Sequence, residues 1–190
     1  FRSWGRESCT IADIHAYRPS KHSLSQSQIL LRNYTADEAR LPMREMVESL
    51  VLELLQIKAV TKCIHVHIGY AVEDVKSTGG SRTLAHYTDS FQELCPAVLA
   101  LFDKYKRPHE LIRRIAVSFE DLVNKAAVPT EMDLFSNALT DIAEQEEHIQ
   151  KTMLNIKGRF GKNAILRASS LQEEGTMQFR NTLVGGHNGE

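Results

Sequence analysis

The sequence predicts an α+β fold: an antiparallel four-stranded sheet with two helices on one face, followed by a C-terminal helical extension. Two stretches place apolar residues every three or four positions, as on one face of a helix, and the stretches around them are short strands separated by turn residues. Their order is strand, helix, strand, strand, helix, strand. This is the split β-α-β-β-α-β arrangement, in which both helices cover the same face of the sheet. The opposite face of the sheet is then left open.

The first strand is predicted over residues 21–32, where polar residues give way to an apolar run. Thr35 and Glu38 have the spacing of a capping box, which marks the beginning of a helix. Pro42 suits the first turn of a helix, however, and favours a start nearer Leu41. The helix carries one apolar stripe: Met43, Met46, Val47, Leu50, Val51, Leu54 and Leu55.

The middle of the chain changes to a period of two, which predicts strands. Ile64, Val66, Ile68 and Tyr70 are expected to face the core, and His65, His67 and Gly69 the solvent. A turn signal over residues 76–80 precedes a returning strand over residues 82–88. A helix fits residues 91–105.

The last strand is predicted over residues 112–122. Ile115, Val117 and Phe119 are expected to face inward, and Arg114, Ala116 and Ser118 outward. Beyond it, residues 126–136 are expected to form a linker with a short apolar island. A further helix is predicted over residues 137–157, with Leu139, Ile142, Ile149, Met153 and Ile156 roughly on one face, and a polar, glycine-rich tail follows.

Composition excludes some classes of protein. The formal net charge is -1, so bulk charge does not indicate a nucleic-acid binder, but five Lys and Arg residues against one Glu lie within residues 104–114. No apolar run is long enough to span a membrane. Three cysteines without a CxxC pair indicate reduced thiols in an intracellular protein. Because the chain begins at Phe1 without a signal stretch, we expect a fragment of a longer protein.

Several segments resemble the C-terminal region of Y-family DNA polymerases, in particular the UmuC-like translesion enzymes. They are residues 21–25, 64–70, 112–118 and 159–171, and the short segments Arg180-Asn181 and Gly185-Gly186-His187. The resemblance implies four parts: residues 1–20 as the end of a thumb domain and a linker, residues 21–125 as a little finger domain, residues 126–136 as a linker, and residues 137–190 as a C-terminal helix with a polar tail.

In that family the little finger lies along the primer–template duplex and contacts phosphates with its open sheet face. The resemblance therefore implies sequence-independent DNA contacts at the following residues: Lys21, Ser23, Ser25, Arg32, Lys76, Arg82, Arg113 and Arg114. The parent protein would be an error-prone, DNA-directed DNA polymerase that acts in DNA repair, in the SOS response to DNA damage. It would work in the bacterial cytoplasm, close to the nucleoid.

No catalytic residue and no metal site are expected in this chain, which is predicted to be inactive by itself. The family's chemistry uses palm carboxylates that hold magnesium, and the acidic pairs Glu73-Asp74 and Glu120-Asp121 lack a third carboxylate in the pattern. His65 and His67 share a strand face without a third ligand, so they are interpreted as polar residues on the DNA side. A small-molecule substrate is not expected either.

Residues Glu131, Met132, Asp133, Leu134 and Phe135 resemble the pentapeptide with which bacterial polymerases bind the sliding clamp. Two large apolar side chains on a linker can fill a pocket of a partner. Glu131 stands where that motif usually has Gln, which removes an amide donor. The alternative is that Leu134 and Phe135 pack on their own domain.

Two other functions stay open on the sequence. One is a stand-alone split β-α-β-β-α-β module that binds RNA, a class that places aromatic residues on the open sheet face. Tyr70 falls with the core set instead, which counts against this hypothesis. The other is a protein-interaction module that uses the Leu-Phe motif and the C-terminal helix.

Overall fold

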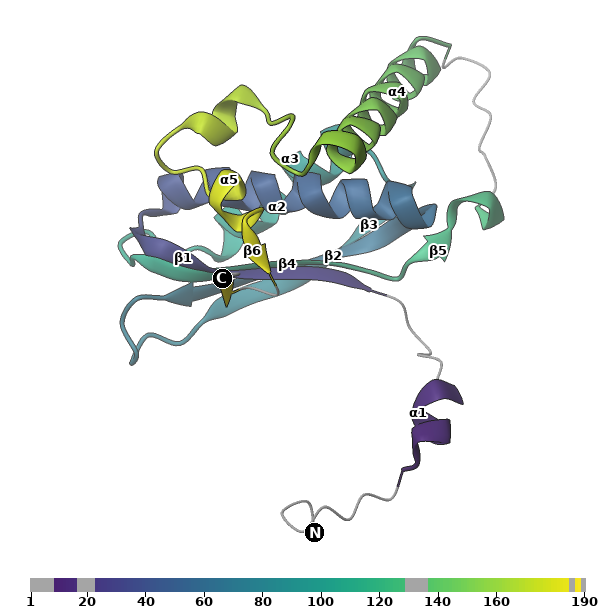
Figure 1. Ribbon diagram of the computed structural model, residues 1–190. Coiled ribbons are helices and arrows are strands. Elements are labelled where there is room, and N and C mark those ends of the chain that lie inside the picture. The colour runs from purple at the N-terminus through teal and green to yellow at the C-terminus, as the bar shows by residue number, and fades with distance from the viewer. Residues whose placement is uncertain (1–8, 17–22, 129–136, 185–186, 189–190) are drawn as a thin grey trace.

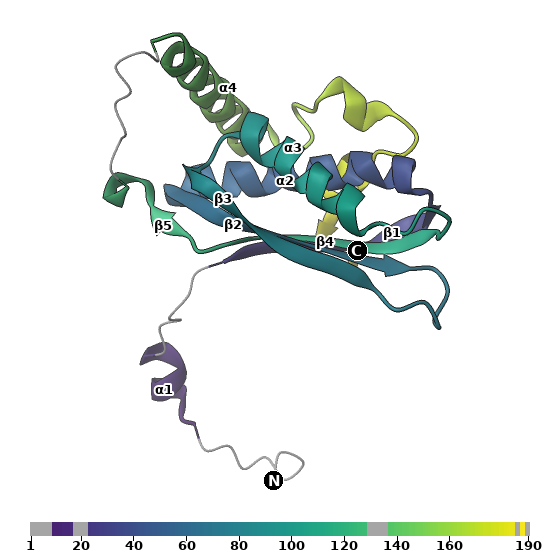
Figure 2. The ribbon, with the colours of Figure 1, turned by 180° about the vertical axis from the view of Figure 1, so that it is seen from behind.

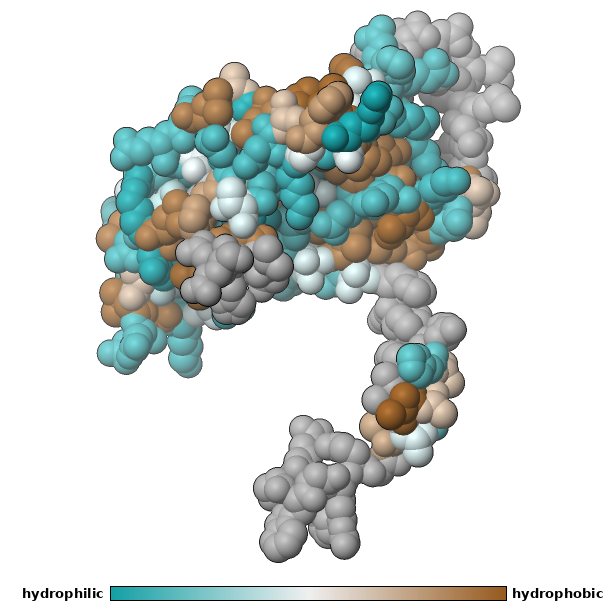
Figure 3. Space-filling model, viewed as in Figure 1, coloured by the Kyte–Doolittle hydropathy of each residue, from teal (hydrophilic) through white to brown (hydrophobic). Residues whose placement is uncertain are grey.

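The computed structural model describes residues 9–16, 23–128, 137–184 and 187–188. A short helix, α1 (Ile11–Ala16), precedes the main body. No helix in these ranges is long and apolar enough to cross a membrane. Figure 3 shows a largely hydrophilic surface with separate hydrophobic patches.

Four long strands form the antiparallel sheet. They are β1 (Leu24–Tyr34), β2 (Ala59–Tyr70), β3 (Thr78–Thr88) and β4 (Ile112–Glu120), in the spatial order β1-β4-β2-β3. A two-residue strand, β5 (Val123–Asn124), pairs with the beginning of β2 and leads into a short 3-10 helix, η2 (Lys125–Ala127). The predicted fold class is thereby confirmed, with β5 as an addition.

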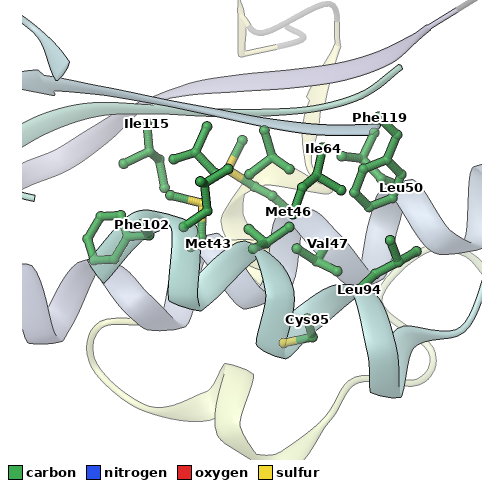
Figure 4. Close-up of a cluster of buried hydrophobic side chains, with 14 of the residues drawn as sticks. Met43, Met46, Val47, Leu50, Ile64, Leu94, Cys95, Phe102, Ile115 and Phe119 are labelled. Carbon is green, nitrogen blue, oxygen red and sulfur yellow. The ribbon is translucent and has the colours of Figure 1, made fainter. Parts of the chain in front are cut away.

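Helices α2 (Ala36–Ile57) and α3 (Phe91–Tyr105) lie side by side on one face of the sheet (Figures 1 and 2). Between them and the sheet lies a continuous core that includes Met43, Met46, Ile64, Phe102 and Phe119 (Figure 4). Each large apolar side chain buried in this way contributes about 1.5–3 kcal/mol before chain entropy is subtracted. The core positions predicted from both periodicities are buried, apart from Leu55 and Tyr70, which are partly buried.

Helix α2 begins where the capping box predicts. Thr35 accepts a hydrogen bond from the backbone N–H of Glu38, and the Glu38 carboxylate accepts one from the backbone N–H of Thr35. The expectation of a start nearer Leu41 is wrong, because Pro42 lies inside the helix and is buried. Satisfying the orphan N–H groups at Thr35 outweighs the preference of proline for the first turn.

The β2–β3 connection differs from the predicted turn. Gly79 and Gly80 lie inside β3, which begins at Thr78. A Cβ on Gly79 would lie 2.2 Å from the Val66 carbonyl oxygen, and one on Gly80 would lie 2.5 Å from the Tyr105 ring. The two glycines therefore allow β3 to approach β2 and α3, rather than form a turn.

The C-terminal part folds back over the helix layer (Figure 1). Helix α4 (Asn137–Phe160) is followed by η3 (Ala168–Leu171), α5 (Met177–Arg180) and the paired strands β6 (Leu183–Val184) and β7 (His187–Asn188). Three residues of the predicted stripe of α4 have described side chains: Met153 is buried, Ile156 is half-buried and Ile149 is exposed. Ile149 therefore does not belong to a packed face.

Candidate functional site

The sheet face opposite α2 and α3 carries no helix formed by the described residues 23–128 and 137–184 (Figures 1 and 2). Residues directly opposite each other in an antiparallel pair share a face. His65 lies opposite both Ser118 of β4 and Ser81 of β3, and Ser118 lies opposite Ser25 of β1. Because the neighbouring Ile64 is buried against the helices, this row faces away from them.

The same register assigns the other rows of this face. We call the following set the open face: Ser25, Ser27, Ile29, Cys63, His65, His67, Gly69, Gly79, Ser81, Thr83, Arg114, Ala116, Ser118 and Glu120. Most members are small, so the backbone of the sheet lies close to anything that approaches. Its edge strands, β1 and β3, also carry backbone N–H groups that no neighbouring strand accepts.

Of the fourteen residues of the open face, Arg114 alone is Lys or Arg, and it lies opposite Gly69. Lys62 lies at the register shift of β2 next to this set, with its Nζ 5.4 Å from the Tyr87 ring centroid. A Cβ on Gly69 would lie 3.1 Å from Arg114 Cβ, so glycine there leaves room for the arginine side chain. Within the described residues, the Arg114 guanidinium has no carboxylate partner. Its charge is therefore available to an external anion.

His67 lies one row from Arg114 on β2. Burial lowers the pKa of His67 below its ordinary value, and the charges of Arg114 and His65 lower it further. At neutral pH the imidazole is therefore uncharged, and Arg114 supplies the positive charge of this region.

The predicted DNA contacts lie in different places in the structure, some on the open face and some around its margin. Ser25 and Arg114 lie on the open face, and Ser23 is exposed directly before β1. Lys76 is exposed between β2 and β3. Arg113 is half-buried at an irregularity of β4, since Arg114 pairs with Gly69 but Ile112 pairs with Tyr70. Lys21 lies outside the described residues.

Two predicted contacts lie elsewhere. Arg82 is opposite Ile64, so its side chain leaves the exposed edge strand β3 on the helix side of the sheet. Arg32 is engaged in an ion pair with Glu38 at 2.8 Å, and its guanidinium lies 4.5 Å from the Tyr34 ring centroid. The open face thus carries one arginine of the predicted set, and the other predicted bases in the described residues lie around its margin or on the helix side.

The sequence analysis did not identify Arg107, a basic residue near the end of the sheet where Tyr70 and Thr78 meet. The backbone N–H of Arg107 donates to the Tyr70 hydroxyl at 3.0 Å, and the Arg107 guanidinium lies 5.6 Å from the Tyr70 ring centroid. The Tyr70 hydroxyl also contacts Thr78 Oγ1 at 2.7 Å. The only sequence signal was the cluster of bases over residues 104–114.

The acidic pairs form no catalytic constellation in the described ranges. Glu73 and Asp74 are exposed, and Asp121 accepts a hydrogen bond from the Tyr87 hydroxyl at 3.1 Å. No group of three or more His, Cys, Asp or Glu side chains that could hold a metal is found in the part of the chain that the structure describes. The clamp-like pentapeptide, Glu131 to Phe135, lies outside that part.

Comparison with known proteins gives the class. The model of the impB/mucB/samB family C-terminal domain matches residues 21–134. The chain therefore belongs to this family, the C-terminal region of the UmuC-like Y-family polymerases. This confirms the resemblance found in the sequence.

Two known proteins are similar to most of this chain. The chain is 30% identical over 172 residues to the protein of Bacillus subtilis (strain 168) named "Putative UV-damage repair protein UvrX", covering 87% of this chain and 38% of that protein. It is 27% identical over 139 residues to DNA polymerase IV of Moorella thermoacetica, covering 70% of this chain and 33% of the polymerase. The chain thus spans little more than a third of these relatives.

Among solved structures, the little finger domain of PolIV in complex with the beta-clamp processivity factor aligns with a TM-score of 0.43 and 12% identity, covering 60% of this chain and 99% of that domain. A ternary complex of Dbh aligns with a TM-score of 0.40 and 17% identity, covering 53% of this chain and 29% of Dbh.

Proposed function

We propose that this chain is a non-catalytic module that binds primer–template DNA through the phosphate backbone during the bypass of DNA damage. The observation that carries the proposal is the open face. It is a sheet surface without a covering helix, and Arg114 stands on it without a carboxylate partner among the described residues.

The composition of the open face suits phosphate better than base recognition. Ser25, Ser27 and Ser118 bring hydroxyl groups close to the plane of the sheet. Hydroxyl and backbone N–H groups bind phosphate oxygens without reading sequence, and Arg114 adds a charged contact. Such contacts suit a polymerase that must accept damaged templates.

The RNA-binding alternative is less well supported. Sheets that read single-stranded RNA stack bases on aromatic side chains. None of the fourteen open-face residues is Phe, Tyr or Trp, and Tyr70 packs against the core. Tyr87, which precedes the buried Thr88 on β3, donates to Asp121 through its hydroxyl, and the Lys62 Nζ lies 5.4 Å from its ring centroid.

For the whole protein, we propose error-prone DNA synthesis across lesions, as part of the response to DNA damage in the bacterial cytoplasm. The names of the relatives, a UV-damage repair protein and DNA polymerase IV, support this assignment. Catalysis with magnesium would then belong to other parts of the protein, and this chain would hold the duplex.

The proposal is tested by fluorescence anisotropy of the chain with primer–template DNA over a range of salt concentrations. We expect weak, sequence-independent binding, and Arg114→Ala should lower the slope of log K against log salt by about 0.9, the value for one lost phosphate contact. Lys104→Ala, on the exposed side of α3, is the matched control and should leave the slope unchanged.

Absence of binding at low salt, or equal slopes for Arg114→Ala and the wild type, would contradict the proposal. Arg82→Ala adds a finer test. Because Arg82 points to the helix side of the edge strand, its substitution should change the slope less than Arg114→Ala.

We also propose that residues 131–135 bind the sliding clamp. The sequence observation is two large apolar residues, Leu134 and Phe135, after an acidic stretch in the segment that joins η2 to α4. A purified sliding clamp should bind the chain, and replacement of both residues by alanine should abolish binding. Glu131→Gln should strengthen it, since the amide donor of the usual motif is restored.

A further inference from the structure

The segment of residues 167–180, which we call the C-terminal clasp, lies against α2 and β1, although more than a hundred residues separate it from both. Its elements η3 and α5 both contact α2. In Figure 1 this segment crosses the outer side of α2 and then runs down toward the edge of the sheet. The clasp therefore joins the helix layer to one edge of the sheet.

A buried carboxylate on α2 anchors the clasp. Glu45 is 2% exposed, and its Oε2 accepts hydrogen bonds from the backbone N–H groups of Thr176 and Met177, both at 2.8 Å. A buried carboxylate is costly unless donors surround it. In the described part of the chain, the hydrogen bonds that the Glu45 carboxylate accepts come from the clasp.

A second anchor lies one turn further along α2. Glu48 is 4% exposed and pairs with Arg167, whose Nε lies 2.5 Å from the carboxylate. The same guanidinium lies 4.3 Å from the centroid of the Phe91 ring on α3. Charge pairing and stacking together fix the first residue of the clasp to both helices.

The other end of the clasp holds β1. Arg180 Nη2 donates to Gln26 Oε1 at 2.7 Å, and the Thr176 hydroxyl lies 3.2 Å from Gln28 Oε1. The Tyr34 hydroxyl donates to the backbone carbonyl of Glu174 at 3.2 Å. Gln26, Gln28 and Tyr34 of β1 thus all have hydrogen-bond partners in the clasp.

These contacts compensate for a weakness of β1. On β2 and β4 the inward positions are filled by buried aliphatic and aromatic residues, but on β1 two of them are Gln26 and Gln28. β1 is an edge strand paired with β4 alone, and its register breaks after Ile29. Gln26 also donates to Glu53 Oε1 of α2 at 3.1 Å, so the clasp supplies the second contact of Gln26 and the contact of Gln28 to Thr176. Losing these contacts should weaken the hold of β1 on the helix layer.

We propose that the clasp is a positioning device for the DNA-binding face, in which Thr176 and Arg180 hold β1 in place from the inner side of the sheet. Ser25, Ser27 and Ile29 alternate with the two glutamines on the same strand, so a displacement of the inner side also moves the open face. This inference rests on the proposed function for its effect on DNA binding, but not for its effect on β1.

The test uses the full chain with Thr176→Val and Arg180→Leu combined. These substitutions remove the side-chain contacts of the clasp to both glutamines and the hydroxyl bond of Thr176 to Glu45, while Gln26 keeps its bond to Glu53 of α2. The buried core cluster lies entirely between Leu30 and Phe119, so the domain should still fold. Thr176→Val alone is a milder second variant. Asn163→Ala is the control, because Asn163 bonds Gln178 and Asn181 within the C-terminal part and does not contact β1.

Two readouts are combined. Hydrogen exchange of the β1 amides over residues 24–29 should become about tenfold faster in the double variant, while β2 and β3 keep wild-type rates, because loss of one or two hydrogen bonds lowers the local opening free energy. The dissociation constant for primer–template DNA should rise about threefold to tenfold, the effect expected of a lost positioning contact rather than a lost charge, with the salt slope unchanged.

Equal acceleration in every strand, or loosened β1 with unchanged DNA affinity, would overturn the inference. If the wild-type chain does not bind DNA, the proposed function fails, and the exchange of β1 alone decides whether the clasp holds this strand. If the wild type binds through Arg114 and the double variant matches it in both readouts, the inference fails and the proposed function stands.

Discussion

Glu38 connects the first strand to the first long helix through a single carboxylate. It accepts the backbone N–H of Thr35 at 2.7 Å and pairs with Arg32 at 2.8 Å. The hydrogen bond from Arg32, with those from Thr35, lowers the Glu38 pKa to about 2. Arg32 is therefore better explained as a helix-capping partner than as a free contact for phosphate.

Glu38→Gln should lower the free energy of unfolding by about 1 kcal/mol at pH 7, the usual size of a capping loss. Because the folded-state pKa lies below the unfolded value of 4.5, this stability is present above pH 4.5 and is lost as pH falls through about 2. Urea denaturation at pH 7 and pH 3 measures the difference, which should be smaller at pH 3. Asp37→Asn, in the same turn and exposed, is the control, and an equal loss in both variants would contradict the assignment.

At the scale of elements, the close approach of β3 to its neighbours depends on two glycines. Gly80→Ala should cost about 1–3 kcal/mol, since the added methyl must displace the Tyr105 ring in a packed region. Gly158→Ala in α4 is a control with the opposite expected effect, because a Cβ there meets nothing within 4 Å. It should stabilise the protein by about 0.5–1 kcal/mol. Thermal denaturation distinguishes the two, and similar midpoints for both variants would contradict the packing of β3.

The elements that were predicted correctly are those with a strong local signal. The apolar stripe and the capping box fixed α2, and α3 has the predicted bounds of residues 91–105. The two faces of β3 were harder to predict, because Gly79, Gly80 and Ser81 give no apolar alternation that could assign a side chain to either face. A shift of one residue reverses the face of a side chain. Arg82 was named as a DNA contact because of the family resemblance, and the register that places it on the helix side could not be read from the sequence.

At the scale of the whole molecule, the main unpredicted feature is the C-terminal clasp. It is held by polar contacts across large sequence distances, such as Glu45 with Thr176, and has no periodicity that a single sequence would reveal. Glu45 and Glu48 lie on a helix of regular pattern and would ordinarily be taken as solvated. The open face itself followed from the order of elements, but its low content of bases became visible only with the strand register.

The central claim is that the open face, and not the helix layer, receives DNA. The most direct measurement is an NMR titration of the isotope-labelled chain with primer–template DNA. Resonances of Ser25, Ser27, His65, His67 and Arg114 should shift most, and those of the outer side of α3 should stay unchanged. Shifts concentrated on α2, α3 or α4, with the open face unperturbed, would contradict the claim.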